Sequence, residues 1–133
     1  MPRLDAIGIV VSSMADSVDF YRHLGLDFPA NSEHEGHVEA ETPGGIRVML
    51  DTEDMLKSFS EWSEPKGGGQ RTALAFLCES PAEVDRIYLA LTSIGGAGVV
   101  APFDAPWSMR YATLTDPDGN HFDVFAHQES PPA

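Results

Sequence analysis

One arrangement of strand and helix signals occurs twice in this chain, and this repetition limits the fold more than any other feature of the sequence. Alternating apolar residues followed by helical spacing are found at 4–25 and again at 71–96. A shift of 67 residues places Tyr21 on Tyr88. We therefore expect two modules that share one plan.

Each module also closes with the same turn and strand. The segments 42–50 and 116–124 align at a shift of 74 residues, which places Gly45 on Gly119. Between its helix and this turn each module has room for two more strands, at 26–31 and 36–42 in the first and at 97–103 and 107–115 in the second. The sequence therefore predicts an α+β fold built from two βαβββ modules.

The length of the chain, 133 residues, is typical of one domain. A Gly-rich segment separates the two modules and is expected to act as a joint. The expected parts are module one at about 1–63, the joint at 64–70, module two at about 71–127 and a frayed tail at 128–133.

The charge of the chain limits its partners. A formal net charge of -13 repels nucleic acid and anionic lipid, so we expect no nucleic-acid partner and no membrane partner. Cys78 is the only cysteine, which excludes an intrachain disulfide. The sequence shows neither a signal-peptide pattern nor the ~20 apolar residues of a membrane span. These features favour a soluble, cytoplasmic protein.

Two segments carry a resemblance to a known family. LDAIGIVVSSMADSVDFYRHLGLDFP is similar to the opening module of the vicinal oxygen chelate superfamily, and WSMRYATLTDPDGNHFDVFA is similar to its closing module. This superfamily is the glyoxalase, bleomycin resistance and dioxygenase group, and the resemblance implies curved mixed sheets around a cavity. Within the group, GGIRVMLDT and APWSMRYATLTDPDGN look most like a drug-sequestering member, the mitomycin-binding resistance protein.

The resemblance also implies where a metal would bind. Metal-using members place four ligands on the opening and closing strands, and these positions fall on Ala6, Met49, Ala73 and Asp123. Alanine has no donor atom and a methionine thioether is a poor ligand for Mg²⁺, Mn²⁺ or Fe²⁺. We therefore expect no metal and no other cofactor. His121 shares the strand parity of Asp123 and could join a rearranged site, although a solvated strand-end histidine is the simpler interpretation.

The closing hairpin predicts a binding face. A three-residue loop after Asp116 sets Thr113 opposite Asp123 and Tyr111 opposite Phe125. One sheet face then mixes polar and aromatic side chains, whereas the other is apolar, as expected beneath helices. The small residues of the opening strands leave room for a ligand, or they let the modules pack tightly. The candidate ligand-binding residues by this parity are Arg47, Met49 and Asp51 in module one, and Met109, Tyr111, Asp123 and Phe125 in module two.

Three more aromatic residues extend the candidate site. The resemblance implies an aromatic wall at Trp107, while Phe59 and Trp62 lie on a predicted loop, FSEWSEP, that could fold over the mouth of the cavity. Rings on both sides of a planar ligand can sandwich it. From the residues alone, Trp107 could equally belong to the core, and Trp62 could pack against a partner subunit.

Two arginines are the cations nearest to this candidate site. Arg47 has the parity of the pocket, so it could pair with Asp51 or Asp123 or bind a carbonyl of the ligand. Arg110 has the opposite parity, which predicts a structural role.

The sequence and the resemblance together predict metal-free binding and sequestration of a small planar organic molecule, as in an antibiotic resistance protein. No catalytic residue is assigned. The chief alternative is a lyase, isomerase or dioxygenase-type enzyme of the same superfamily that uses Asp123, with or without a metal. A third possible function is that of a dimeric scaffold that binds no ligand. The resemblance further implies a homodimer with two equivalent pockets, each lined by Met49 and Asp51 of one chain and by Trp107 and Tyr111 of the other.

Overall fold

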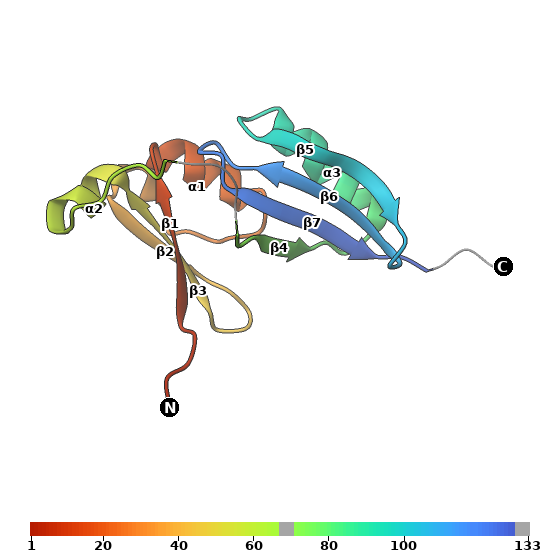
Figure 1. The fold of residues 1–133 in the computed structure, drawn as a ribbon, viewed down its shortest axis with the longest axis horizontal. Helices are drawn as coiled ribbons and strands as arrows, with labels where there is room; N and C mark the ends of the chain where they lie inside the picture. The colour runs from red at the N-terminus through yellow and green to blue at the C-terminus, as the bar shows by residue number, and fades with distance from the viewer. Residues whose placement is uncertain (67–70, 130–133) are drawn as a thin grey trace. The chain divides into compact units, whose positions relative to one another are not determined.

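The chain divides into two compact units, Met1–Gly67 and Gly68–Ala133 (Figure 1). This computed structural model describes residues 1–66 and 71–129. Most of the predicted Gly-rich joint and the end of the predicted tail lie outside the described residues. Each unit contains one of the two predicted modules, and the predicted module bounds and their assignment to a single domain stay predictions.

The first unit opens with a strand and a helix, as the sequence predicts. Strand β1 (Ala6–Val11) leads into helix α1 (Met14–Arg22). The helix begins where the Ser13 hydroxyl accepts a hydrogen bond from the backbone N–H of Asp16 at 3.3 Å, which satisfies one of the otherwise unpaired donors of the first turn.

The sheet of the first unit has three strands in the order β1-β3-β2. Strand β2 (His37–Glu41) runs antiparallel to β3 (Arg47–Thr52), and β3 runs parallel to β1. Thr52 then caps a short helix, α2 (Glu53–Phe59), by accepting the backbone N–H of Met55 at 3.1 Å. The sequence predicts a loop at Phe59, and this prediction is wrong, because Phe59 is the last residue of α2.

The strand predicted at 26–31 is absent from the first unit. Two backbone carbonyls of this segment, those of Phe28 and Pro29, accept hydrogen bonds from the Arg22 guanidinium at 3.0 and 2.9 Å. Asn31 then takes a left-handed backbone conformation with φ of 65°, and a 3-10 helix, η1 (Ser32–His34), follows. These contacts replace the strand pairing that the repeat implied, so module one is βαββ.

The second unit has the full predicted plan. Strand β4 (Leu74–Leu77) leads into helix α3 (Pro81–Thr92), which has Pro81 in its first turn as expected. Three antiparallel strands follow, and the sheet order is β4-β7-β6-β5. Their bounds are β5 (Ala97–Ala105), β6 (Met109–Thr115) and β7 (His121–His127).

The closing hairpin has the predicted register. Thr113 pairs with Asp123 and Tyr111 with Phe125 across β6 and β7. Gly119 closes the turn with a φ of +87°, a conformation that glycine adopts without steric cost. Because successive side chains of a strand lie on opposite faces of the sheet, this register places each side chain of β6 and β7 on the face predicted from the sequence.

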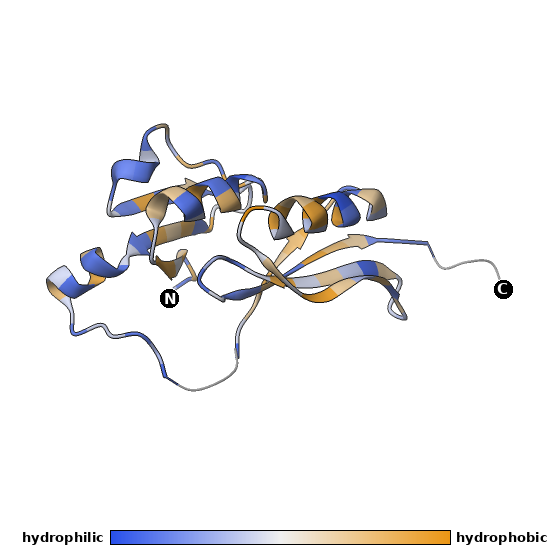
Figure 2. Cartoon of the chain, turned by 90° about the horizontal axis from the view of Figure 1, so that it is seen from above, coloured by the Kyte–Doolittle hydropathy of each residue, from blue (hydrophilic) through white to orange (hydrophobic). Residues whose placement is uncertain are grey.

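In each unit a helix packs on one face of the sheet, and the core consists of the side chains between the helix and that face. In the second unit α3 lies along one face of the sheet (Figure 2). Val84 and Leu91 of α3 are fully buried, and so are the sheet residues of that face, Ala112, Leu114, Phe122 and Val124. In the first unit α1 contributes Val18, Phe20 and Tyr21, and the sheet contributes Val38, Val48 and Leu50. The α+β fold with two mixed sheets is confirmed.

The contact between α3 and β5 depends on one glycine. A Cβ atom built at Gly98 would lie 2.0 Å from the hydroxyl oxygen of Tyr88 and 2.8 Å from the adjacent ring carbon. No other residue fits this position without moving the helix or the ring. Among residues 1–66 and 71–129, no helix is both long enough and apolar enough to cross a membrane.

Candidate functional site

The open face of the second unit, which is the sheet face opposite α3, carries a row of aromatic side chains. We call Phe103, Trp107, Tyr111 and Phe125 the aromatic row. Three of them are adjacent through strand register, since Phe103 pairs with Tyr111 and Tyr111 with Phe125. Trp107 lies in the turn between β5 and β6, and 53 % of its surface is exposed.

Each ring of the aromatic row packs against at least one other ring of the row. Trp107 packs edge-on against Phe103, with centroids 6.1 Å apart, and against Tyr111 at 5.7 Å. Tyr111 and Phe125 are stacked at 6.2 Å with an interplanar angle of 29°. Such pairs hold each other in place, so the row offers ring surface whose orientation is largely fixed before any ligand arrives.

Asp123 lies beside the aromatic row on the same face. Its Oδ2 accepts a hydrogen bond from the Tyr111 hydroxyl at 2.5 Å, and its Oδ1 accepts one from the Thr113 hydroxyl at 2.7 Å. Burial, and secondly the hydrogen bond to Asp123, raises the pKa of Tyr111 to about 12. Tyr111 therefore stays protonated at neutral pH and acts as a donor to Asp123.

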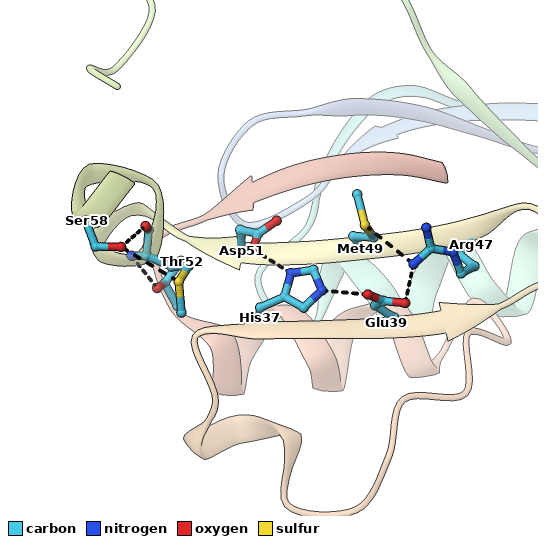
Figure 3. Close-up of polar contacts among 8 residues, drawn as sticks. His37, Glu39, Arg47, Met49, Asp51, Thr52 and Ser58 are labelled. Atoms are coloured by element: carbon cyan, nitrogen blue, oxygen red, sulfur yellow. Dashed lines mark hydrogen bonds and ion pairs between the residues drawn. The ribbon is translucent and has the colours of Figure 1, made fainter. Parts of the chain in front are cut away.

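The open face of the first unit is charged instead of aromatic (Figure 3). Five charged side chains form a hydrogen-bonded sequence that we call the ionic chain, in the order Asp5, Arg47, Glu39, His37 and Asp51. Arg47 donates to Glu39 and, at 2.6 Å, to Asp5. His37 contacts Glu39 through Nε2 at 2.7 Å and Asp51 through Nδ1 at 2.6 Å.

His37 must carry a proton on both ring nitrogens to make these contacts. A neutral imidazole has one donor and one acceptor nitrogen, whereas both partners here are carboxylates, which accept. The hydrogen bonds that His37 donates, first to Glu39 and then to Asp51, raise the pKa of His37 above its ordinary value. The hydrogen bonds from His37 and then Arg47 lower the pKa of Glu39. Each carboxylate of the ionic chain therefore contacts a positively charged side chain, and the three carboxylates and two cations together carry one net negative charge.

The structure places the predicted site residues in two groups. Tyr111, Asp123 and Phe125 lie together on the open face of the second unit, with Met109 on the same face and Trp107 at the adjoining turn. Trp107 is half exposed, so the interpretation of Trp107 as a core residue is wrong. The first unit holds the others, Arg47, Met49, Asp51, Phe59 and Trp62.

Several predicted contacts in the first unit are different in the structure. Arg47 pairs with Asp5 and Glu39 in place of Asp51, and its predicted pairing with Asp123 of the other unit stays a prediction. Asp51 instead contacts His37. The ring of Trp62 lies 5.8 Å from the ammonium nitrogen of Lys57, and its predicted place over a ligand stays a prediction.

Sequence reasoning missed His37, Glu39 and Phe103 as site residues. The signal was present, because His37 and Glu39 alternate with the buried Val38 and Ala40 in the predicted strand at 36–42. His121 was expected to be solvated, but its Nδ1 atom is buried and has no hydrogen-bond partner among the described residues.

Arg110 has the structural role that its parity predicted. It lies on the helix side of the sheet and donates to Asp85 of α3 at 3.0 Å. A second contact joins it to Asp104 of β5 at 3.1 Å. Arg110 therefore ties helix to strand and takes no part in the open face.

The four positions where a family metal would bind do not fit a divalent cation. Ala6 and Ala73 have no donor atom, and Met49 offers only a thioether sulfur. Asp123 alone among these four residues offers carboxylate oxygens, and one carboxylate does not make a metal site. Within residues 1–66 and 71–129, no group of three or more His, Cys, Asp or Glu side chains is placed to hold a metal ion.

The fold and the sequence together define the class of this protein. Residues 3–124 match the model of the Glyoxalase/Bleomycin resistance protein/Dioxygenase superfamily. Because this match covers more than half of the chain, the protein belongs to that superfamily. No curated protein sequence matched the chain.

Solved structures agree with this assignment at the level of the fold. A glyoxalase-related enzyme from Fulvimarina pelagi superimposes with a TM-score of 0.76 at 15% identity, over 96% of this chain and 89% of that one. A glyoxalase/bleomycin resistance protein/dioxygenase family enzyme from Burkholderia phytofirmans gives 0.74 at 19% identity, over 95% and 99%. A glyoxalase family protein from Bacillus cereus gives 0.72 at 18% identity, over 97% and 96%. Identities this low support the shared fold and nothing finer.

Proposed function

We propose that this protein binds and sequesters a small planar organic molecule without a metal, and that the ring of the ligand rests on the aromatic row. The half-exposed indole of Trp107, held edge-on to Phe103 and Tyr111, is the observation that carries the proposal. Exposed ring surface in contact with water is costly, so a flat ligand that covers it gains free energy from burial and stacking.

Other exposed apolar surface extends the same face. Leu77 of β4 is 62 % exposed and pairs in register with Phe125 of β7. Asp123 and Thr113 supply polar atoms beside this apolar area. A largely apolar surface with a few oriented polar groups is typical of sites that bind small organic molecules.

The biological role that we propose is resistance to a toxic compound. A protein that holds a drug tightly keeps it from its target, and this role requires affinity but no reacting group. The donor set at Ala6, Met49, Ala73 and Asp123 supports a metal-free mode of binding. Membership in a superfamily that includes bleomycin resistance proteins is consistent with this role.

The first unit is proposed to contribute through a second chain. Each sheet ends in edge strands, β1 and β2 in the first unit and β4 and β5 in the second, and edge strands favour association. We propose a homodimer, which sedimentation equilibrium at micromolar concentration would detect. A monomer near 14.4 kDa that still binds ligand would contradict pockets shared between chains.

The proposal is tested by titrating tryptophan fluorescence with a panel of planar compounds. Trp107→Ala should weaken binding at least about tenfold, which corresponds to about 1.4 kcal/mol, because it removes the largest exposed ring of the row. Unchanged affinity with a strongly lowered melting temperature would contradict a binding role for Trp107. Trp62→Ala provides the matched comparison, since an equal loss would place the ligand against Trp62 as well.

The same titration separates the alternatives. No response to any planar compound would favour the ligandless scaffold. Conversion of a bound compound into a product, followed by mass spectrometry, would favour the enzyme. A tightly held stoichiometric divalent metal in the purified protein that is lost in Asp123→Asn would contradict metal-free binding.

A further inference from the structure

We infer that the ligand of the aromatic row is a cation, a flat aromatic molecule that carries a protonated amine or another positive charge. This inference rests on the proposed function and adds the chemical class of the ligand. It is carried by one juxtaposition, that of the Asp123 carboxylate with the ring faces of the aromatic row on the open face of the second unit.

Asp123 has no ion-pair partner among the described residues 1–66 and 71–129. Two arginines of the second unit are already paired with other carboxylates. Arg86 contacts Glu83 at 3.0 Å, and Arg110 contacts Asp85 at 3.0 Å. Within the part of the chain that the structure describes, the only donors to Asp123 are neutral hydroxyl groups. Its negative charge is therefore not compensated, in contrast to every carboxylate of the ionic chain.

The carboxylate is also held in a defined position. Thr113 pairs with Asp123 across β6 and β7, and the hydroxyls of Thr113 and Tyr111 each take one carboxylate oxygen. A carboxylate has about four lone-pair sites, so both oxygens can accept a further hydrogen bond from a ligand. A cation that approaches this site meets an acceptor that is already oriented, which reduces the entropy cost of binding.

The rings supply a second attraction for a cation. Tyr111 links the two features, because it donates to Asp123 and also packs against Trp107 and Phe125. The face of an aromatic ring is electron-rich, and tryptophan is the strongest of the aromatic side chains in cation–π contacts. A planar cation could therefore stack on the row while its charge lies near Asp123. A neutral ligand would gain only the stacking.

The charge of the whole chain acts in the same direction. A net charge of -13 attracts cations and repels anions over distances comparable to the screening length, which is about 8 Å at physiological ionic strength. This effect raises the association rate of a cation. It falls with added salt and does not depend on any single side chain, so it can be separated from the local effect of Asp123.

Three probes with one ring system test the inference. Anthracenylmethylammonium is a cation, anthracenemethanol is neutral and anthracene carboxylate is an anion, and their ring surfaces are matched. Fluorescence titrations of the full chain at physiological salt should show that the ammonium compound binds at least about tenfold more tightly than the alcohol. The carboxylate should bind most weakly.

Substitutions assign the preference to Asp123. Asp123→Asn keeps the shape of the side chain and removes its charge, so the preference for the ammonium over the alcohol should fall about tenfold while the alcohol binds as before. Asp19→Asn is the matched control, because it makes the same change of side chain at one exposed position of α1 in the first unit, and it should change the preference less than about twofold. Tyr111→Phe keeps the carboxylate of Asp123, so it should keep the preference for the ammonium. It provides a second test if Asp123→Asn does not fold.

The outcomes separate the inference from the proposed function. Equal affinity for the ammonium and the alcohol would overturn the inference and leave planar binding intact. A preference that survives in Asp123→Asn, or disappears in Tyr111→Phe, would also overturn it. No binding of any probe would overturn both. Affinity that falls as the protein concentration rises would assign the open face to a second copy of the chain.

Discussion

The two units of this chain share one core plan and differ in what they expose. Each places a helix on one sheet face, and the buried residues of that face are apolar in both. The opposite face is an ionic chain in the first unit and an aromatic row in the second. Packing beneath a helix limits a sheet face to apolar side chains, whereas an open face is free to diverge.

The two open faces also differ in whether their binding capacity is already used. In the first unit His37 and Arg47 each contact two carboxylates, so the charges satisfy one another. In the second unit the rings leave apolar surface exposed, and the described residues give Asp123 only neutral donors. This difference is why the proposed function places the ligand on the second unit.

The similarity of the two cores is tested by matched truncations. Phe20 of the first unit is 0% exposed and Phe122 of the second is 1% exposed. Phe20→Ala and Phe122→Ala should each lower the free energy of unfolding by about 3–5 kcal/mol, because each leaves a large cavity. Chemical denaturation measures both. If one variant loses less than about 1 kcal/mol, the two cores are not equivalent.

The strand that only the second unit has is tested at a glycine. Gly98→Ala should cost about 1–3 kcal/mol, because its Cβ would overlap Tyr88, and β5 cannot move away without losing its contact with α3. Gly8→Ala in β1 is the matched control. A Cβ there would meet only the terminal methyl of Met49 at 3.7 Å, so its stability should be unchanged or slightly higher. Equal effects in thermal denaturation would contradict the close α3–β5 contact.

The sequence predicted those parts of the fold that depend on local patterns. Ser80 and Pro81 mark the start of α3, and Gly119 fixes the turn that sets the register of β6 and β7. Strand alternation then assigns Tyr111 and Asp123 to one face. These features depend on residues that are neighbours in sequence or are joined by a short turn.

The parts that were not predicted depend on contacts with more distant partners. The strand expected at 26–31 is missing because Arg22 of α1 takes two of its carbonyls. The partners of Arg47 were not predicted, because Asp5 lies 42 positions away in the sequence and immediately before another strand, β1. A long, flexible arginine side chain reaches several carboxylates, and only the assembled sheet decides which it contacts.

The hydroxyl of Tyr111 provides a smaller test of the second open face. Tyr111→Phe should lower the free energy of unfolding by about 1–2 kcal/mol at neutral pH, because Asp123 loses one of two donors. The folded-state pKa of Tyr111 is raised from 10.0 to about 12. The advantage of the wild type is therefore fully present below pH 10 and is lost as the pH rises through the folded-state value.

The control for this variant is Tyr88→Phe, whose hydroxyl lies on the helix side of the sheet against Gly98. This variant should change stability by less than about 0.5 kcal/mol. Urea denaturation of both variants at neutral pH measures the difference. Equal small effects would show that the contact between Tyr111 and Asp123 contributes little to the second unit.

The smallest expected effect belongs to the ionic chain of the first unit. The pKa of His37 is raised in the folded state above its ordinary value of 6.5, so the contribution of His37 to stability is fully present below that pH. It is lost as the pH rises through the folded-state pKa, because a neutral ring can no longer donate to both Glu39 and Asp51. The side chain is 38% exposed, and solvent screening should keep the effect below about 1 kcal/mol.

Two measurements check this expectation together. An NMR titration should give a midpoint for His37 above 6.5, and Asp51→Asn should lower that midpoint, because it removes one of the two carboxylates that favour the charged ring. His37→Gln should be less stable than the wild type at pH values below 6.5 and should approach it in alkaline solution. A midpoint at or below the ordinary value would mean that the ionic chain does not stabilise the protonated form of His37. The two open faces would then differ less than the structure indicates, since neither would carry a fixed set of compensated charges.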